Sequence, residues 1–201
     1  MKPILFNTEM VKAILDGRKT TTRRVIKPQP INGIMTAAGL LKAIPEHMDW
    51  GGKVIKPTYQ KDDVLYVRET FGTYRACDII SYAFKADYID PKNLEKAKLL
   101  VRRWHPSIHM PKEAARIFLR VTDVKAERLQ DITDNEAKAE GTDSDVQIAG
   151  GYVNPNYYRS RFSWHVWDST IKKSNLNRYG WDANPWVWVI SFERTARPDE
   201  K

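Results

Sequence analysis

The sequence predicts one α+β domain spanning residues 1–201, a small twisted β-barrel of about six strands with flanking helices and long insertions. Short stretches of alternating apolar and polar residues recur between turn residues, and amphipathic segments separate them. A length of 201 residues suits a single domain with insertions better than several domains. The hydrophobic fraction of 42%, with seven Trp, nine Tyr and six Phe, is sufficient for a packed core and argues against disorder.

The N-terminal region predicts a strand, a helix and a second strand. Residues 2–6 form the first strand, and Asn7 or Thr8 caps the helix that follows. An apolar stripe at helical spacing identifies this helix: Met10, Val11, Ile14 and Leu15. Gly17 ends it, because glycine readily adopts the left-handed conformation found after helices. The β-branched, basic segment 20–26 is then the second strand.

The middle of the chain carries two of the three expected insertions. Residues 27–60 show no clean period and are predicted to be a long loop or insertion. Strands are expected over residues 64–67 and 79–85, and a short helix over residues 91–100. A second insertion, at about residues 72–112, is implied by the family resemblance given below.

The clearest strand and the most specific helix start come next. Residues 115–125 alternate apolar and polar side chains, which predicts a strand with one buried face. Thr133 and Glu136 have the spacing of a capping box, and Gly141 ends the helix that they begin.

The third insertion spans residues 142–180. Its first part, residues 142–158, is polar and rich in Gly and Asn, which favours a mobile loop. Residues 160–171 carry an apolar stripe typical of a helix. Residues 186–192 alternate Trp and Val and are predicted to be the closing strand.

Charge and cysteine content restrict the function further. The net charge is +8 with a sequence pI near 9.5, which favours polyanionic partners. Cys77 is the only cysteine, so the chain has no internal disulfide and no multi-cysteine zinc site. The sequence contains neither a signal peptide nor a membrane-spanning apolar stretch, and we expect a cytoplasmic protein without cofactor or metal.

The strongest candidate site is the segment that joins the first helix to the second strand. It contains four basic residues and three hydroxyls: Arg18, Lys19, Thr20, Thr21, Thr22, Arg23 and Arg24. Arginine suits bidentate contacts to an anionic or carbonyl-bearing ligand. Cationic neighbours lower the pKa of Lys19 and favour its use as a base. Strand alternation separates Lys19 from Thr22 unless a turn or bulge follows Gly17. The structural alternative is a solvated basic strand edge.

Two further groups are weaker candidates. Arg68 and Glu69 directly follow an apolar strand, so they either face a cleft or form an exposed ion pair. Trp104 and His109 lie in a proline-rich loop able to stack on or hydrogen-bond a base, or they are parts of a rigid structural loop. Zinc binding at this loop has little support, since the chain has four His and no HExxH motif.

Glu140 and the tryptophans complete the candidates. Glu140 ends its helix, where the helix dipole disfavours a negative charge and so suits a proton donor or acceptor. An exposed surface glutamate is the structural alternative. Five tryptophans cluster near the C-terminus: Trp164, Trp167, Trp181, Trp186 and Trp188. Core packing explains most of them, but one or two, with Trp181 a candidate, are expected to line a nucleobase pocket.

These motifs resemble the ASCH domain family of the PUA-like β-barrels, which is associated with RNA. The family pattern G-x-K-x-x-x-x-R is matched by Gly17, Lys19 and Arg24. Small bacterial amidohydrolases of this family act on N4-acetylcytidine, and their catalytic Lys and Thr correspond to Lys19 and Thr22. Their catalytic Glu follows an L-x-x-[IL]-T segment, and this register leads to Glu140. The insertions are not covered and resemble longer ASCH proteins of bacteriophages and prophages.

The resemblance implies a hydrolase of an acylated or modified cytosine nucleoside. Lys19 would deprotonate Thr22, Thr22 would attack the acyl carbon, and Glu140 would protonate the departing amine. Arg24 or Arg23 would stabilise the oxyanion. Two alternatives remain: a module that binds a modified or flipped base in RNA or DNA, with RNA favoured, and a ribonuclease.

Overall fold

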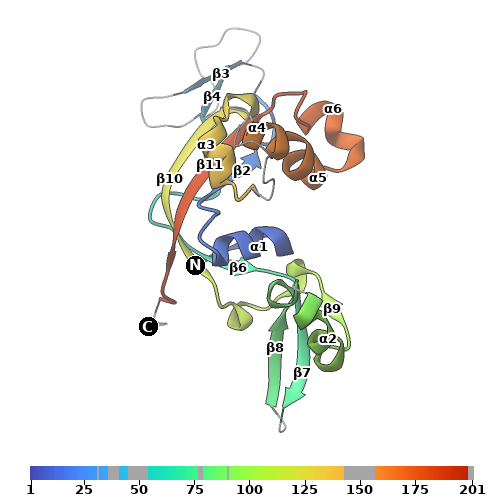
Figure 1. The fold of residues 1–201 in the computed structure, drawn as a ribbon. Coiled ribbons are helices and arrows are strands. Elements are labelled where there is room, and N and C mark those ends of the chain that lie inside the picture. Colours follow the sequence, from blue (N-terminus) through green and yellow to red (C-terminus); the bar gives the residue numbers. More distant parts are fainter. Residues whose placement is uncertain are drawn as a thin grey trace. The chain divides into compact units, whose positions relative to one another are not determined.

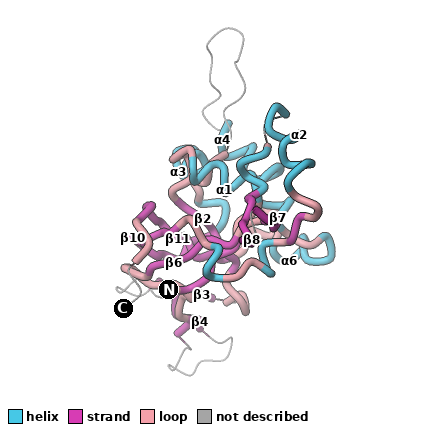
Figure 2. The backbone as a smooth tube through the Cα atoms, turned by 90° about the horizontal axis from the view of Figure 1, so that it is seen from below, coloured by secondary structure: helices cyan, strands magenta, loops and turns pink. Residues whose placement is uncertain are grey.

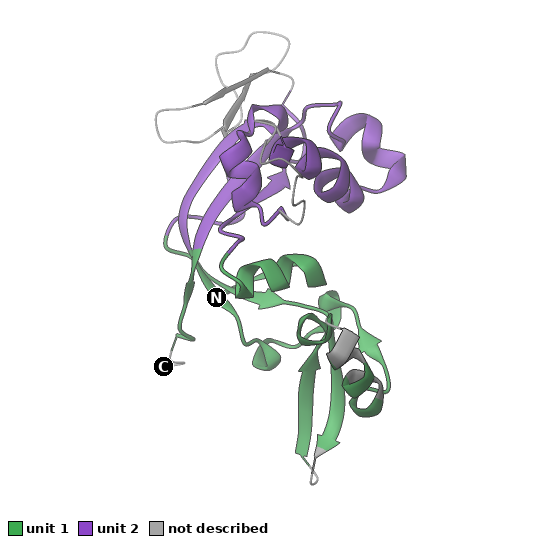
Figure 3. Cartoon of the chain, in the orientation of Figure 1, with its two compact units in different colours: residues 1–17, 62–120, 193–201 green, residues 18–61, 121–192 purple. Residues whose placement is uncertain are grey.

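The computed structural model describes residues 1–30, 32–35, 41–44, 54–76, 79–89, 91–142 and 157–198. The chain divides into two compact units (Figure 3). Unit 1 contains residues 1–17, 62–120 and 193–201, and unit 2 contains residues 18–61 and 121–192. The loop expected over residues 142–158 lies almost entirely outside the described residues, and so does Cys77.

Helices and strands both contribute to the structure, so the predicted α+β class is confirmed (Figures 1 and 2). Within the described ranges the strands form open sheets, and none of these sheets closes into a barrel. None of the helices there is long and apolar enough to cross a membrane.

The first sheet of unit 1 begins with the predicted N-terminal strand. Strand β1 (Lys2–Leu5) runs parallel to β6 (Val64–Arg68), with Ile4 opposite Val67. The start of β10 (Phe118–Arg128) pairs antiparallel with β6. Helix α1 (Thr8–Leu15) lies between β1 and β2 in the chain, and it buries Val11, Ala13 and Ile14. The Asn7 side chain accepts a hydrogen bond from the Met10 amide at 2.8 Å, which confirms the predicted cap.

A second sheet of unit 1 contains strands that the sequence did not predict. Strand β7 (Phe71–Ala76) pairs with both β8 (Ile79–Phe84) and β9 (Trp104–His105). Helix α2 (Pro91–Leu100) follows β8 as expected. Strand β7 lacks apolar alternation and β9 has only two residues, so neither has a recognisable sequence pattern.

Unit 2 is built on the antiparallel pair of β2 (Thr21–Val25) and β11 (Trp186–Thr195), and β10 is the other neighbour of β11. The first three residues of β10 belong to unit 1, and the remainder belong to unit 2. Strand β10 starts later than residue 115, because a short 3-10 turn occupies Lys112–Ala114. The last residues of β11 extend past the predicted end at residue 192.

The described part of unit 2 contains four short α-helices. They are α3 (Asp134–Ala139), α4 (Tyr157–Arg161), α5 (Asp168–Thr170) and α6 (Leu176–Tyr179), with a π-helical segment, Phe162–Trp167, between α4 and α5. Helix α3 and the π-helical segment contribute buried residues to a core on one face of β11, which consists of Leu129, Ile132, Ala137, Phe162, Trp167, Val187 and Val189. Because side chains alternate along β11, Trp188 and Ile190 point to the opposite face.

The insertion at residues 27–60 contains a small sheet where a loop was expected. Strands β3 (Asn32–Met35), β4 (Leu41–Ile44) and β5 (Val54–Ile55) pair antiparallel in that order. Each strand has four residues or fewer, which is too short for a periodic pattern to identify it.

Gly72 is expected to be essential to the packing of β7 in unit 1. A Cβ at this position would lie 2.2 Å from Val101 Cγ1 and 3.2 Å from the Arg103 carbonyl oxygen. We expect Gly72→Ala to lower the free energy of unfolding by about 1–3 kcal/mol through overpacking. Urea unfolding followed by circular dichroism measures this loss. Thr73→Val, at an exposed position of the same strand, is the control and should change stability by less than about 0.5 kcal/mol.

Candidate active site

Lys19 and Glu140 form a buried ion pair in unit 2. The Lys19 Nζ atom lies 2.7 Å from Glu140 Oε2, and the two side chains are 0% and 2% exposed. Nζ also donates to the backbone oxygens of Glu140 at 2.9 Å and of Thr21 at 2.7 Å. The backbones of Lys19 and Glu140 form an isolated antiparallel bridge. Two catalytic candidates that are 121 residues apart in the sequence are therefore in direct contact.

Local structure explains this contact. Gly17 has a φ of 74°, and β2 begins only at Thr21, so Lys19 precedes the regular strand. The Thr133–Glu136 capping box fixes where α3 begins, and Glu140 is its C-cap residue. The Thr20 amide then donates to the Ala139 carbonyl at 2.8 Å, which attaches the end of α3 to the start of β2.

The Arg23 guanidinium contacts three carboxylates. It lies 2.6 Å from Glu127 Oε1, 3.3 Å from Glu136 Oε2 and 3.2 Å from Glu140 Oε1. Its side chain is fully buried. The sequence placed Arg23 at a ligand or oxyanion, whereas the structure places it against glutamates.

Lys125 completes what we call the charge network, which consists of Lys19, Arg23, Lys125, Glu127, Glu136 and Glu140. Lys125 Nζ lies 2.9 Å from Glu127 Oε2 and 3.0 Å from Glu136 Oε1. Three cations thus meet three carboxylates. This balance matters because a buried charge without a partner is strongly destabilising.

The two lysines of the network respond differently to their surroundings. Burial lowers the pKa of Lys19, the Glu140 carboxylate opposes this effect, and Arg24 and Arg23 add to the lowering. Lys125 is less buried, and its contacts with Glu127 and Glu136 outweigh the effect of burial and raise its pKa. A buried amine with a lowered pKa, next to a carboxylate, is suited to accept a proton near neutral pH.

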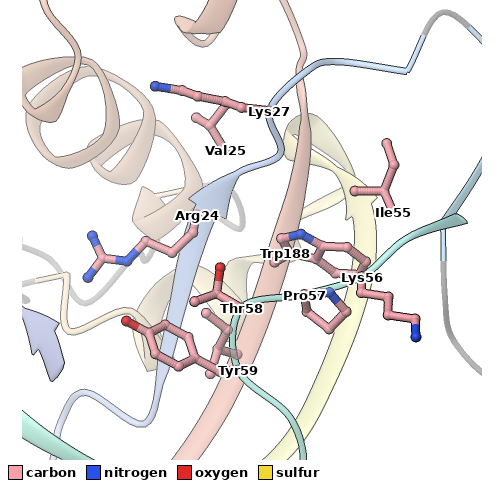
Figure 4. A pocket seen from close by; sticks show the side chains of 10 residues that line it. Arg24, Val25, Lys27, Ile55, Lys56, Pro57, Thr58, Tyr59 and Trp188 are labelled. Carbon is pink, nitrogen blue, oxygen red and sulfur yellow. The ribbon is translucent and has the colours of Figure 1, made fainter. Parts of the chain in front are cut away.

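A cavity of about 340 Å³ lies on the face of β2 that carries Arg24 (Figure 4). Trp188 of β11 and Tyr59, from the segment after β5, also line it. Burial lowers the pKa of Arg24, while Tyr59 and Glu140 act in the opposite direction. Figure 4 shows the polar ends of Arg24 and Tyr59 on the same side of the cavity. The sequence did not identify Tyr59, because its insertion lacks a recognisable motif.

Thr22 shares a strand face with Arg24, because side chains alternate along β2. It lies opposite Ile190, and its side chain is buried. The Thr21 carbonyl that accepts the Lys19 hydrogen bond belongs to the peptide bond preceding Thr22. The Lys19 amine is therefore held at the backbone just before Thr22, and it shares the Glu140 carboxylate with Arg23.

Arg18 makes a separate contact just after the end of helix α3. Its guanidinium donates to the Gly141 carbonyl at 3.2 Å. Gly141 has a φ of 82° and directly follows Glu140. Arg18 thus supports the turn that positions the glutamate.

Four predicted site residues belong to unit 1: Arg68, Glu69, Trp104 and His109. Arg68 donates to the carbonyl oxygens of Met110, at 2.9 Å, and Ile108. Glu69 is buried and binds Arg116 at 2.9 and 3.1 Å, and burial raises its pKa although Arg116 opposes the shift. Both residues stabilise the loop structure of this unit.

The aromatic candidates occupy separate places. Trp104 packs against Tyr88 with ring centroids 6.0 Å apart. His109 is exposed, and its amide donates to the Pro106 carbonyl within a 3-10 turn. In unit 2, Trp181 contacts Phe162 with ring centroids 6.5 Å apart and lines a hollow other than the Arg24 cavity.

The described part of the chain contains no group of three or more His, Cys, Asp or Glu side chains that could hold a metal ion. In comparisons with known proteins, no family model, no curated protein and no solved structure matched the chain.

The opposite pKa shifts of Lys19 and Lys125 predict opposite pH dependences of stability. Lowering the pKa of Lys19 makes the unfolded state bind more protons, so its contribution to the unfolding free energy rises with pH up to about 10.4. The stability difference between wild type and Lys19→Met should therefore increase as the pH rises toward about 10.4. For Lys125→Met the difference should stay level over this range and fall above it. Urea unfolding across this pH series tests both signs, and equal slopes for the two variants would contradict the assignment.

Arg23 is expected to stabilise unit 2 more than any exposed ion pair does. Arg23→Met leaves three carboxylates without their shared partner and should cost about 3–5 kcal/mol of unfolding free energy. The control, Arg120→Met, removes an exposed pair with Glu193 and should cost about 1 kcal/mol or less. Similar losses from both variants in urea unfolding would show that the network adds no special stability.

Proposed function

We propose that the chain is a hydrolase that removes an acyl group from the exocyclic N4 of a modified cytosine, on an ASCH-type scaffold of the PUA-like β-barrel class. One observation carries the proposal: the fully buried Lys19 amine lies 2.7 Å from the Glu140 carboxylate. A lysine with a lowered pKa next to a carboxylate provides a base and a proton relay within one contact.

The first chemical step forms a covalent acyl-enzyme. Lys19 first passes its proton to Glu140 along their 2.7 Å hydrogen bond, and the Thr22 hydroxyl oxygen then attacks the acyl carbon while its proton passes to the neutral Lys19 amine. Negative charge develops on the acyl oxygen, where Arg24 stabilises it. We assign this role to Arg24 rather than Arg23, because Arg23 is occupied by three carboxylates whereas Arg24 lines the cavity.

The second step returns the proton to the leaving group. Glu140, which holds the proton received from Lys19, protonates N4 as the carbon–nitrogen bond breaks, and the charged Lys19–Glu140 pair is restored. Water then hydrolyses the Thr22 ester: its oxygen bonds to the acyl carbon, and a proton is relayed through Lys19 to the Thr22 oxygen. The products are the free cytosine amine and a carboxylic acid.

The cavity is suited to a nucleoside. Its volume of about 340 Å³ lies within the range of small-molecule sites. The Trp188 and Tyr59 rings offer flat apolar surfaces for a base. Arg24, Lys27 and Lys56 also line it and favour a ligand with phosphate or carbonyl oxygens.

The same lining favours one alternative, a module that binds a modified base without hydrolysing it. In that case the three cations of the cavity bind the ligand, and the Lys19–Glu140 pair only stabilises the fold. The two functions differ in whether Lys19 and Glu140 are needed for turnover or only for structure.

Acetate release from N4-acetylcytidine distinguishes the two functions. We expect Lys19→Met and Glu140→Gln to lower kcat at least about 100-fold, because general acid–base catalysis contributes at least this much. Thr22→Val should abolish turnover, and Thr22→Ser should retain part of it, which separates loss of the nucleophile from loss of the fold. Arg120→Met, in unit 1, is the control and should keep wild-type activity. Wild-type protein that binds the nucleoside and releases no acetate would contradict the hydrolase and support the binding module.

A further inference from the structure

A second hollow in unit 2 shares no lining residue with the Arg24 cavity. Arg159, Ser160, Ser163, Trp164 and Trp181 line it, and its volume is about 280 Å³. Four of these residues come from the third insertion, residues 142–180, which the family resemblance does not cover, and Trp181 directly follows it. The hollow therefore needs an explanation of its own.

Trp164 is the first unusual feature of this hollow. Its side chain is 69% exposed, whereas Phe162, Ser163 and Trp167 of the same π-helical segment are buried. An indole that packs against nothing costs solubility and adds no core stability. π-helical turns occur frequently at functional sites, because they reorient side chains that a regular helix would align differently.

Arg159 is the second unusual feature. Its guanidinium lies 5.6 Å from the centre of the Trp181 ring, and one terminal nitrogen donates to the Gln130 carbonyl at 2.7 Å. The Nε atom is buried and has no hydrogen-bond partner within the described residues. Because solvent does not reach Nε and Nη2 binds Gln130, Nη1 is the guanidinium donor that an acceptor in the hollow can reach. The backbone and one nitrogen fix the side chain, so this donor is already positioned.

The surrounding charge identifies the sign of that acceptor. Residues 157–181 contain Arg159, Arg161, Lys172, Lys173 and Arg178, but only one acidic residue, Asp168. Asp168 is itself occupied, because it accepts a hydrogen bond from the Trp181 amide at 2.8 Å. Lys172, Lys173 and Arg178 are exposed. The segment is thus a basic surface that carries an exposed aromatic ring.

We propose that this hollow binds single-stranded nucleic acid, with a base stacked on Trp164 and an oxygen of the strand accepting from Arg159 Nη1. A basic surface combined with an exposed aromatic ring is the usual way of holding a single strand without sequence preference. An acidic peptide would satisfy the charge but would leave the flat indole face unused. The proposal does not depend on hydrolysis at Lys19.

Fluorescence anisotropy with labelled oligonucleotides tests the proposal. The probes are oligothymidylate and oligouridylate dodecamers, an abasic dodecamer with the same number of phosphates, and a polyglutamate of similar charge. We expect both base-containing probes to bind wild-type protein about tenfold or more tightly than the abasic strand or polyglutamate, because stacking on one aromatic ring contributes that much. A difference between the thymidylate and uridylate probes decides which nucleic acid is preferred.

Variants locate the binding to this hollow. Trp164→Ala should weaken oligonucleotide binding about tenfold or more, and Trp164→Tyr should restore most of it, because tyrosine also offers a flat ring. The control is Leu99→Ala, which removes an 88% exposed apolar side chain from unit 1 and should leave affinity unchanged. Acetate release from the free nucleoside should be the same in Trp164→Ala as in wild type, so failure of the hydrolase and failure of this site give different results.

Three outcomes would overturn the proposal. Equal affinity for base-containing and abasic strands would show that the contact is only electrostatic. Equal affinity for polyglutamate would assign the surface to acidic proteins. An unchanged affinity in Trp164→Ala, with the variant folded by circular dichroism, would place nucleic-acid binding elsewhere in the chain.

Discussion

The organisation of unit 2 depends on the charge placed inside it by Lys19 and Glu140. A buried ammonium and a buried carboxylate are each costly, and each becomes acceptable only because the other is in contact with it. The remaining Glu140 oxygen is bound by Arg23, which in turn needs Glu127 and Glu136. This chain of requirements connects β2, β10 and α3, so the same contacts that form the candidate catalytic pair also hold the fold together.

The two faces of strand β2 have different roles, because its side chains alternate between the charge network and the cavity. Arg23 points into the charge network, while Thr22 and Arg24 occupy the face of the cavity. The partner strand β11 repeats this division, with Val187 and Val189 in the helical core and Trp188 lining the cavity. Chemistry and support can thus lie one residue apart without competing for the same space.

Features set by neighbouring residues were predicted well from the sequence, whereas features that depend on contacts with other segments were predicted poorly. The Asn7 cap, the Thr133–Glu136 capping box and the strand containing Trp188 follow from short-range rules, and all three are present. The position of Glu140 against Lys19 was expected from the family register, which carries long-range information that spacing lacks. The short strands β3, β4 and β5 were not foreseen because they are too short for a periodic pattern, and the role of Arg23 was not foreseen because its partners are remote in sequence.

Helix α3 is bound near both of its ends by the same arginine. Glu136 in the first turn and Glu140 at the C-cap are four residues apart, so they lie on one face and both reach Arg23. Each added or removed residue would rotate one glutamate by about 100° relative to the other. Evolution is therefore free to vary exposed positions such as Asn135 and Lys138 but not the number of residues between the two glutamates, and natural variants of this protein should differ in the composition of α3 while keeping its length.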